Sequence, residues 1–311
     1  MSTEIAQARA EPVIAGRLIR DAADFDPANP IGVWRGIPEA DYHADKTTLS
    51  ASSAKVLLGK RSPEDSWHLR FGTFCHIALL EPERLAEYVC LDAAAIAGNN
   101  PKTGKPYDSP TMTGKWKAAV AEAEQDGKTV VSQEDWDRMR GILDAIAVHP
   151  TAQKLLDLST EHELSAYAEH ETGAIVRGRF DLFGPGLITD LKTTTNGDPA
   201  KFGARAYDFG YHISAANYLD LAAAHDLDVQ GFAFLNAEKE PTPGGKYRIS
   251  VVDLTDRAIQ KGREDMAEAC RRWLANGRVV DLPDYGDGFW TVDLPAYAYR
   301  DHDQTEYQET A

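Results

Sequence analysis

The sequence predicts an α/β domain in which a central mixed β-sheet is flanked by helices on both faces. Residues 161–194 alternate apolar and polar side chains and are divided by short turns, a pattern typical of consecutive strands. Segments with the 3.6-residue periodicity of helices precede and follow this region, and two more strand-like runs lie between residues 229 and 254. Helices and strands interspersed in this way indicate a sheet covered by helices.

The N-terminal part of the chain predicts helices after a loose start. Residues 1–40 show no sustained periodicity, so we expect them to be loosely ordered. LSASSAKVLL predicts a helix opened by a Ser or Thr cap, and FGTFCHIALLEPERLAEYV predicts a helix that bends or restarts at Pro82. In SQEDWDRMRGILDAIAVHP, Ser132 and Asp135 resemble a capping box. The apolar stripe of this helix predicts core packing and consists of Trp136, Met139, Leu143 and Ile146.

The following segments predict the sheet. HELSAYAEH, AIVRGRFDLF and LITDLKTT are three strands in quick succession, the last two joined by a Gly-Pro-Gly turn as an antiparallel hairpin. A helix is expected over about 207–224, then strands VQGFAFLNAE and KYRISVVDL, then a long helix over 255–275. We expect one domain over residues 41–298 and a polar, disordered tail over 299–311.

Composition and charge narrow the class of protein. The chain has 311 residues, of which 43% are hydrophobic and 26% charged, an ordinary globular composition. It shows no signal-peptide pattern and no apolar run near the roughly 20 residues of a membrane span, so we expect a cytoplasmic protein without membrane contact. Three cysteines without a CxxC pattern argue against a zinc site or an iron–sulfur cluster. The net charge of −16 disfavours general contact with nucleic acid.

One region departs from this acidic balance. Residues 98–117 carry four lysines against one aspartate and are rich in Gly and Pro, as expected of a mobile surface loop. Such a basic loop is either simply solvated or contacts phosphate groups, and the composition leaves both readings open. The four side chains are Lys102, Lys105, Lys115 and Lys117.

The hairpin carries the candidate chemistry. Asp190 and Lys192 alternate on one face of their strand, roughly 7 Å apart, while Leu191 points into apolar packing. If the two strands pair, Asp181 joins Asp190 on that face. Two carboxylates are the number that Mg²⁺ usually takes from a protein beside substrate phosphate, and the lysine can hold that phosphate. The alternative is a structural ion pair between Asp190 and Lys192, although two charges on a buried strand have little other reason to be there.

These motifs resemble a known family. GRFD followed by ITDLKTT is similar to the core of the PD-(D/E)XK nuclease superfamily, which implies a PD-(D/E)XK nuclease-like core. Over about residues 42–275 the chain resembles the exonuclease VIII (RecE-type) family of phage and prophage recombination exonucleases. The matching segments include YHADKTTLSASSAKVLL, FGTFCHIALLEP, HELSAYAEHETGAIVRGRFDLF and GYHISAANYLDLA, in this order.

The resemblance implies roles for individual residues. The metal ligands would be His76, Asp181, Asp190 and the carbonyl of Leu191, with Mg²⁺ as the cofactor and Mn²⁺ as a possible substitute. The catalytic residues would be Glu163, Asp181, Asp190 and Lys192, with Lys192 and Glu163 activating or positioning the attacking water. Without the resemblance, His76 reads as a core histidine and Glu163 as a solvated carboxylate.

The chain departs from the family on one helix. The family has a glutamine four residues before a tyrosine, whereas this chain has Ser214 before Tyr218. Serine is too short to reach the same place, so the contact is lost, taken by His212 or bridged by water. The side chains expected to contact DNA are the four lysines of the basic loop together with Arg177, Arg179, His212, Ser214 and Tyr218.

The function implied is a Mg²⁺-dependent exodeoxyribonuclease acting on ends of linear double-stranded DNA. The resemblance further implies 5′-to-3′ digestion, a homo-oligomer, and phage-type homologous recombination with a single-strand annealing protein. Two alternatives are a nuclease-fold DNA-binding protein with weak or no cleavage and an assembly protein; the presence of Asp181, Asp190 and Lys192 argues against both. A nucleotide phosphohydrolase is disfavoured because no Gly-rich phosphate loop is present.

Overall fold

The computed structural model describes residues 19–60, 66–282 and 287–295, and every structural statement below refers to these. The chain divides into one unit that ends at Val280 and a second that begins at Asp281. All described helices and strands lie in the first unit. The expected polar tail, residues 299–311, lies outside the described residues, and the expected domain boundary at residue 298 stays a prediction.

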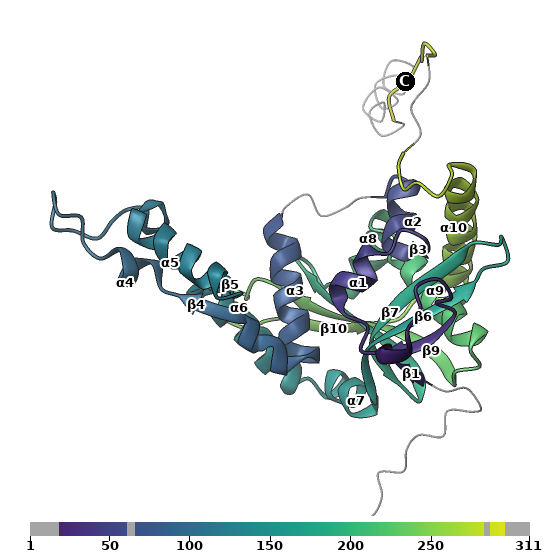
Figure 1. The fold of residues 1–311 in the computed structure, drawn as a ribbon, viewed down its shortest axis with the longest axis horizontal. Coiled ribbons are helices and arrows are strands. Elements are labelled where there is room, and N and C mark those ends of the chain that lie inside the picture. Colours follow the sequence, from purple (N-terminus) through teal and green to yellow (C-terminus); the bar gives the residue numbers. More distant parts are fainter. Residues whose placement is uncertain (1–18, 61–65, 283–286, 296–311) are drawn as a thin grey trace, which may run out of the picture. The chain divides into compact units, whose positions relative to one another are not determined.

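A mixed sheet forms the centre of the first unit (Figure 1). Its strands pair antiparallel except for β1–β2, β8–β9 and β3–β7, which are parallel. A crossover through helices joins the parallel strands β8 and β9, as a parallel pair requires. The expected mixed α/β sheet is thereby confirmed. In spatial order the strands are β1 (Ile19–Asp21), β2 (Gly32–Arg35), β6 (Glu161–Glu169), β7 (Ile175–Gly184), β8 (Gly186–Thr194), β9 (Val229–Glu238) and β10 (Ile249–Val252), with β3 (Leu49–Ser50) added on β7.

The start of the chain is more ordered than expected. Of residues 1–40, those from Ile19 onward supply β1, the 3₁₀ turn η1 (Ala22–Asp24), β2 and the beginning of α1 (Glu39–Ala44). Trp34 of β2 is 2% exposed and packs with Tyr42 and Tyr167. Strands of three and four residues are too short to show a period. β2 is fixed by pairing with β6, more than 120 residues away, and β1 is fixed by pairing with β2.

Helices cover both faces of the sheet. On one face lie α2 (Ala51–Leu57), α8 (Pro199–Asp208), α9 (Tyr211–Ala224) and α10 (Asp256–Ala275), which share a core with Phe232 and Phe234 of β9. On the other lie α3 (Ser66–Leu80), α6 (Gln133–Ala147) and α7 (Pro150–Leu158), which share a core with Leu191 and Leu235. None of the described helices is both long and apolar enough to cross a bilayer.

Local signals for helix ends are confirmed. The Ser50 side chain caps α2 by accepting from the backbone N–H of Ser53, and Ser132 caps α6 in the same way from Asp135. The helix expected to restart at Pro82 does so as a 3₁₀ segment, η2 (Pro82–Glu87). The helix expected over about 207–224 is present as α9. An unpredicted helix, α8, precedes it, and Gly210, with a left-handed φ of +66°, lies between the two.

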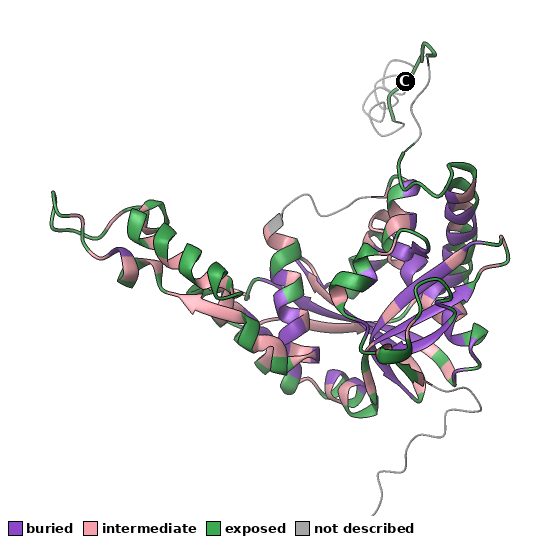
Figure 2. Ribbon diagram, in the orientation of Figure 1, coloured by how far each residue is buried: buried purple, intermediate pink, exposed green. Residues whose placement is uncertain are grey.

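The basic loop belongs to an arm that projects from the sheet (Figure 1). The arm comprises β4 (Tyr88–Leu91), α4 (Ala93–Ala97), η3 (Pro110–Met112), α5 (Gly114–Gln125) and β5 (Thr129–Ser132). Strands β4 and β5 pair parallel as a separate two-stranded sheet. Figure 2 shows the arm as largely exposed, and α5 has no buried residue.

Candidate active site

The site begins where β7 and β8 separate. The two strands pair at Leu182–Thr189, Phe183–Ile188 and Gly184–Leu187, and the ladder ends just before Asp181 and Asp190. The Asp181 Oδ2 then accepts a hydrogen bond from the backbone N–H of Leu191 at 2.7 Å, which holds this carboxylate against β8. Both aspartates are buried, Asp190 being only 2% exposed.

Alternation along β8 follows the expected pattern. Leu191 is 1% exposed and packs in the core formed with α3 and α6. Asp190 and Lys192 point away from that core and form an ion pair through Oδ2 and Nζ. The ion pair is compatible with both interpretations of the sequence. A purely structural Asp–Lys pair and a catalytic lysine held in place by Asp190 would have the same geometry.

The backbone of Glu163, which contributes a carboxylate to the site, has a strained conformation. It has a φ of +51°, a left-handed conformation that costs a residue other than glycine about 1–3 kcal/mol. The β6–β7 ladder pairs His162 with Leu182 and resumes with Leu164 and Phe180, so Glu163 interrupts it opposite Asp181. The interruption turns the Glu163 carboxylate toward Asp181 rather than leaving it in the regular pleat.

His76 completes the group from the opposite side. It lies on α3, its Nε2 is 2.9 Å from the carbonyl oxygen of Leu191, and its Nδ1 is 3.7 Å from Asp181 Oδ2. One ligand atom from each of His76, Glu163 and Asp181 lies within 4.8 Å of the others. Asp190, which the resemblance also places among the ligands, lies outside this group of three and pairs with Lys192, and its role as a ligand stays a prediction.

Electrostatics at this cluster favour a cation. Burial, together with the charge of Asp181, raises the pKa of Glu163 to about 8. Burial and the charge of Asp190 raise the pKa of Asp181 to about 6, even though His76, Lys192 and the Leu191 N–H act to lower it. A divalent cation would relieve this repulsion, and two carboxylates with an imidazole form a donor set that suits one. The residues present therefore fit a divalent metal ion.

The state of Lys192 follows from its partners. Burial acts to lower its pKa, but the negative charges of Asp190 and Asp181 outweigh that effect and raise it above the ordinary lysine value. The two carboxylates therefore favour the ammonium form of Lys192, which can donate hydrogen bonds to an anion.

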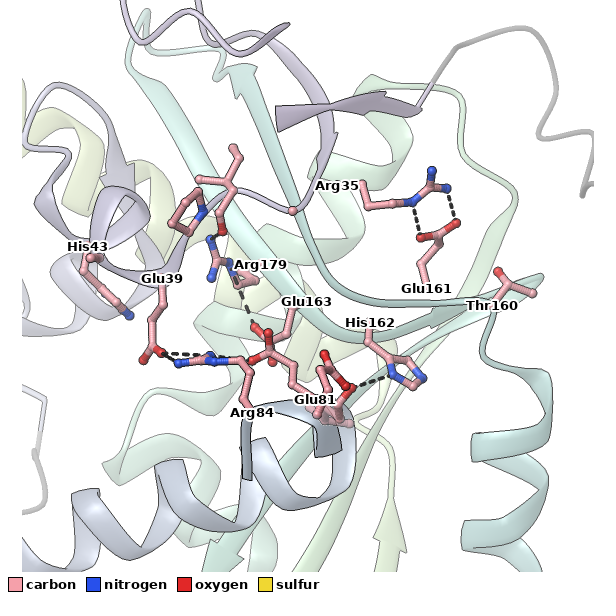
Figure 3. Close-up of a pocket in the computed structure, with 16 residues that line it drawn as sticks. Arg35, Glu39, His43, Glu81, Arg84, Thr160, Glu161, His162, Glu163 and Arg179 are labelled. Carbon is pink, nitrogen blue, oxygen red and sulfur yellow. Dashed lines mark hydrogen bonds and ion pairs between the residues drawn. The ribbon is translucent and has the colours of Figure 1, made fainter. Parts of the chain in front are cut away.

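Two cavities meet at this cluster. The smaller, about 450 Å³, is lined by His76, Asp181, Asp190 and Lys192 among others. The larger, about 940 Å³, shares with it Glu163, Arg179, Glu39, His43 and Glu81. In Figure 3, Glu163 lies beside Arg179, and Arg84 reaches the carboxylates of Glu39 and Glu81 across the larger cavity.

The side chains expected to contact DNA are dispersed. Arg179 lines both cavities, and Tyr218 lines the smaller one with its ring against Gly178. Arg177 is 4% exposed and is held by Asp45 and by the hydroxyl and carbonyl of Thr48, so its guanidinium is engaged within the protein. The four lysines of the arm are exposed and line neither cavity.

Two of these expectations need correction. His212 is 3% exposed, and its ring nitrogens contact the Ala206 carbonyl and the Asp265 carboxylate, each at 2.9 Å. Ser214 is 4% exposed and lines neither cavity. Neither side chain can therefore replace the missing glutamine by touching a ligand in the cleft.

The sequence did not predict several residues of the smaller cavity, among them Lys55, Tyr211 and Lys239. Lys55 lies within the capped segment LSASSAKVLL, where a lysine on a short helix reads as solvated surface. Tyr211 directly follows the glycine that divides α8 from α9, which is a signal for a turn rather than for a site.

Comparisons with known proteins agree with this architecture. The model of a PDDEXK-like domain of unknown function (DUF3799) matches residues 47–286. No curated protein matches the chain. A solved structure of a putative exonuclease from Eubacterium rectale is 16% identical, covers 85% of this chain and 97% of its own, and superposes with a TM-score of 0.51, which shows a shared fold.

Two further structures are more distant. An alkaline exonuclease from Laribacter hongkongensis is 13% identical with a TM-score of 0.27, over 63% of this chain and 93% of its own. A phage-related exonuclease from Haemophilus somnus 129PT is 16% identical with a TM-score of 0.28, over 61% and 97%. The family match spans most of the chain and includes His76, Glu163, Asp181, Asp190 and Lys192. The protein belongs to the family of PDDEXK-like domains, as its resemblance to the PD-(D/E)XK superfamily predicted.

Proposed function

We propose that this protein is a metal-dependent nuclease that hydrolyses phosphodiester bonds of DNA. The observation that carries the proposal is the cluster of His76, Glu163 and Asp181 beside the paired Asp190 and Lys192, inside a cleft. This cluster unites a donor set for a divalent cation with an ammonium able to bind phosphate. The sequence resemblance supports the finer proposals: Mg²⁺ as the cation, linear double-stranded DNA as the substrate, exonucleolytic 5′-to-3′ digestion, and a role in strand-annealing recombination.

Different residues of the site would bind the metal ion and the phosphate. His76, Glu163 and Asp181 would hold the cation, with the Leu191 carbonyl beside them. When bound, a divalent cation supplies positive charge that polarises the scissile phosphate and lowers the pKa of a coordinated water. Asp190 keeps the Lys192 ammonium in the cleft, where it donates hydrogen bonds to a non-bridging phosphate oxygen and stabilises charge that develops during hydrolysis. In its ammonium form, Lys192 would position the phosphate and the attacking water through hydrogen bonds.

The test is incubation of the purified protein with linear duplex DNA labelled at either the 5′ or the 3′ end, in Mg²⁺, Mn²⁺ or EDTA. We expect loss of label in the two metal ions and none in EDTA, with mononucleotides released first from the 5′ label. Covalently closed circular duplex is the control for end dependence. Tight DNA binding without cleavage in either metal would contradict the proposal and favour a nuclease-fold DNA-binding protein. Cleavage that starts at the 3′ label would refute only the polarity.

A further inference from the structure

Lys55 reaches the smaller cavity without being part of the cluster described above. It lies on α2, and its Nζ is 5.6 Å from the ring centroid of Tyr211. The Nζ of Lys192 is also 5.6 Å from that centroid. Two ammonium groups therefore contact one aromatic ring in the wall of the same cavity.

The ammonium of Lys55 has no direct ion-pair or hydrogen-bond partner among the described residues, unlike those of its neighbours. The other lysines and arginines of the two cavities each have a carboxylate or carbonyl partner, as in Arg35–Glu161, Arg84–Glu81, Arg177–Asp45, Arg179–Ile37, Lys192–Asp190 and Lys239–His68. Within the described part of the chain, Lys55 has no hydrogen-bond or ion-pair partner for its ammonium. A half-buried cation of this kind is a position where an anion from outside would be stabilised.

The surrounding structure fixes where Lys55 points. Helix α2 is anchored in the core by Ala54 and Leu57, which are 0% and 1% exposed. The aliphatic stem of Lys55 runs over Gly210, where an added Cβ would lie only 2.8 Å from Lys55 Cγ. Burial, and secondarily the Lys192 charge, lower the pKa of Lys55 to about 7 against the opposing effect of Asp190. A bound oxyanion would offset that penalty on the ammonium.

We propose that Lys55 binds a phosphate group of the nucleic acid next to the phosphate that Lys192 contacts. The inference rests on the proposed function of this site and names a residue that selects where the substrate backbone lies. The ammonium groups of Lys55 and Lys192 lie over the same ring in the same cavity, so a strand that presents one phosphate to Lys192 would bring a neighbouring phosphate toward Lys55. That neighbour is either an internal phosphodiester or a terminal phosphate, and both offer the same oxyanion chemistry.

The experiment measures duplex binding in EDTA, so that binding is separated from cleavage. Three fluorescent duplexes of one sequence carry a 5′-phosphate, a 3′-phosphate or no terminal phosphate, and each is titrated over a series of salt concentrations. Lys55→Met keeps an unbranched stem over Gly210 and removes the charge; Lys55→Arg restores the charge. Lys60→Met is the matched control, because Lys60 lines neither cavity and its Nζ lies over the ring of Tyr207.

We expect Lys55→Met to bind about tenfold more weakly, as for loss of one charged hydrogen bond. The slope of log K against log salt should fall by about 0.9, the value for one phosphate contact on duplex DNA. Lys55→Arg should recover both quantities, and Lys60→Met should match the wild type. An equal loss on all three duplexes identifies an internal phosphodiester, and a loss confined to one identifies its terminal phosphate.

Three results would overturn the inference: an unchanged slope and affinity in Lys55→Met, an equal effect in Lys60→Met, or no binding of any duplex by the wild type. Cleavage in Mg²⁺ is measured separately on the wild type. Binding that depends on Lys55 without any cleavage would refute the proposed nuclease activity while leaving the Lys55 contact in place.

Discussion

At the scale of single residues, the site combines an ion pair, a strained backbone and a buried cluster of acids. Asp190 is 2% exposed and has Lys192 as its ion-pair partner, whereas Glu163 holds its carboxylate in place at the cost of a φ of +51°. Strain and buried charge both lower the stability of the folded state. Variants at these positions can therefore separate a role in function from a role in packing.

Removing Lys192 is expected to slow cleavage strongly and also to destabilise the fold. Lys192→Ala deletes a donor that stabilises transition-state charge, an effect of about 10²-fold or more on the rate. It also leaves buried Asp190 unpaired, which we expect to cost about 2 kcal/mol, between the values for exposed and fully buried pairs. The control is Lys192→Ala combined with Asp190→Asn, which should regain stability in urea unfolding but not single-turnover cleavage. Near-normal turnover of Lys192→Ala would exclude Lys192 from the mechanism.

Glu163 offers a test of whether its strain serves metal binding. Glu163→Gln retains the strained backbone and removes the charge, whereas Glu163→Gly removes the side chain and suits the left-handed φ. We expect both to bind Mn²⁺ at least about tenfold more weakly, with only Glu163→Gly gaining roughly 1 kcal/mol from relief of strain. Calorimetric titration of Mn²⁺ and thermal unfolding in EDTA provide the two readouts. Wild-type Mn²⁺ affinity in both variants would remove Glu163 from the ligand set.

At the scale of elements, the cleft depends on close packing of helices behind it. Helices α9 and α10 approach at Gly262, where an added Cβ would lie 2.1 Å from the carbonyl oxygen of His212 and 2.8 Å from Ala216 Cβ. The His212–Asp265 contact links the same two helices. Because α9 also carries Tyr211 and Tyr218 into the smaller cavity, this packing positions part of its wall.

The glycine contact predicts a large effect from one methyl group. Gly262→Ala should destabilise the protein by about 3 kcal/mol, since backbone on a packed helix must move to admit the Cβ. Gly203→Ala on α8 is the matched control: nothing lies within 4 Å of its Cβ position, so it should stabilise by roughly 0.4–1 kcal/mol. Urea unfolding measures both. A Gly262→Ala variant as stable as Gly203→Ala would mean that α9 and α10 are packed less closely than described.

Local sequence patterns predicted those elements that depend on near neighbours. The Ser50 and Ser132 caps and the alternation of Asp190, Leu191 and Lys192 follow from spacings of one to three residues. Features that depend on residues distant in the sequence were not predictable in the same way. β2 forms through pairing with β6, and the His212 ring contacts Asp265 on another helix instead of facing the cleft.

The same limit applies to Lys55 and Glu163. Lys55 becomes part of the cleft only because α2 packs against the start of α9. No hydrophobic periodicity in the sequence predicts a contact between these two distant segments. The left-handed φ of Glu163 is likewise invisible in HELSAYAEH, which reads as an unbroken strand. In both cases tertiary packing decides the geometry of the site.

At the scale of the whole molecule, the acidic chain has one locally basic segment that lies apart from the cleft. The chain carries a net −16, whereas the arm exposes four lysines at a site apart from both cavities. A polyanionic substrate would be repelled by most of the surface and attracted by local basic regions. Over the whole arm, residues 88–132, five acidic residues balance five lysines. Only the segment 98–117, with four lysines against Asp108, is therefore a candidate contact surface for duplex DNA, beside the simpler reading of a solvated loop.

Replacing the arm lysines tests these two readings. The variant with Gln at positions 102, 105, 115 and 117 should bind duplex in EDTA more weakly, and each lost phosphate contact should lower the salt slope by about 0.9. Its single-turnover cleavage rate at saturating DNA should equal that of the wild type, because none of these residues lines the cleft. A control with Gln at Lys60, Lys154, Lys201 and Lys246 changes the net charge equally and lies outside both cavities. If the two variants shift the slope by the same amount, the effect comes from net charge alone and the arm is ordinary solvated surface; a larger shift for the arm variant makes it a contact surface for DNA.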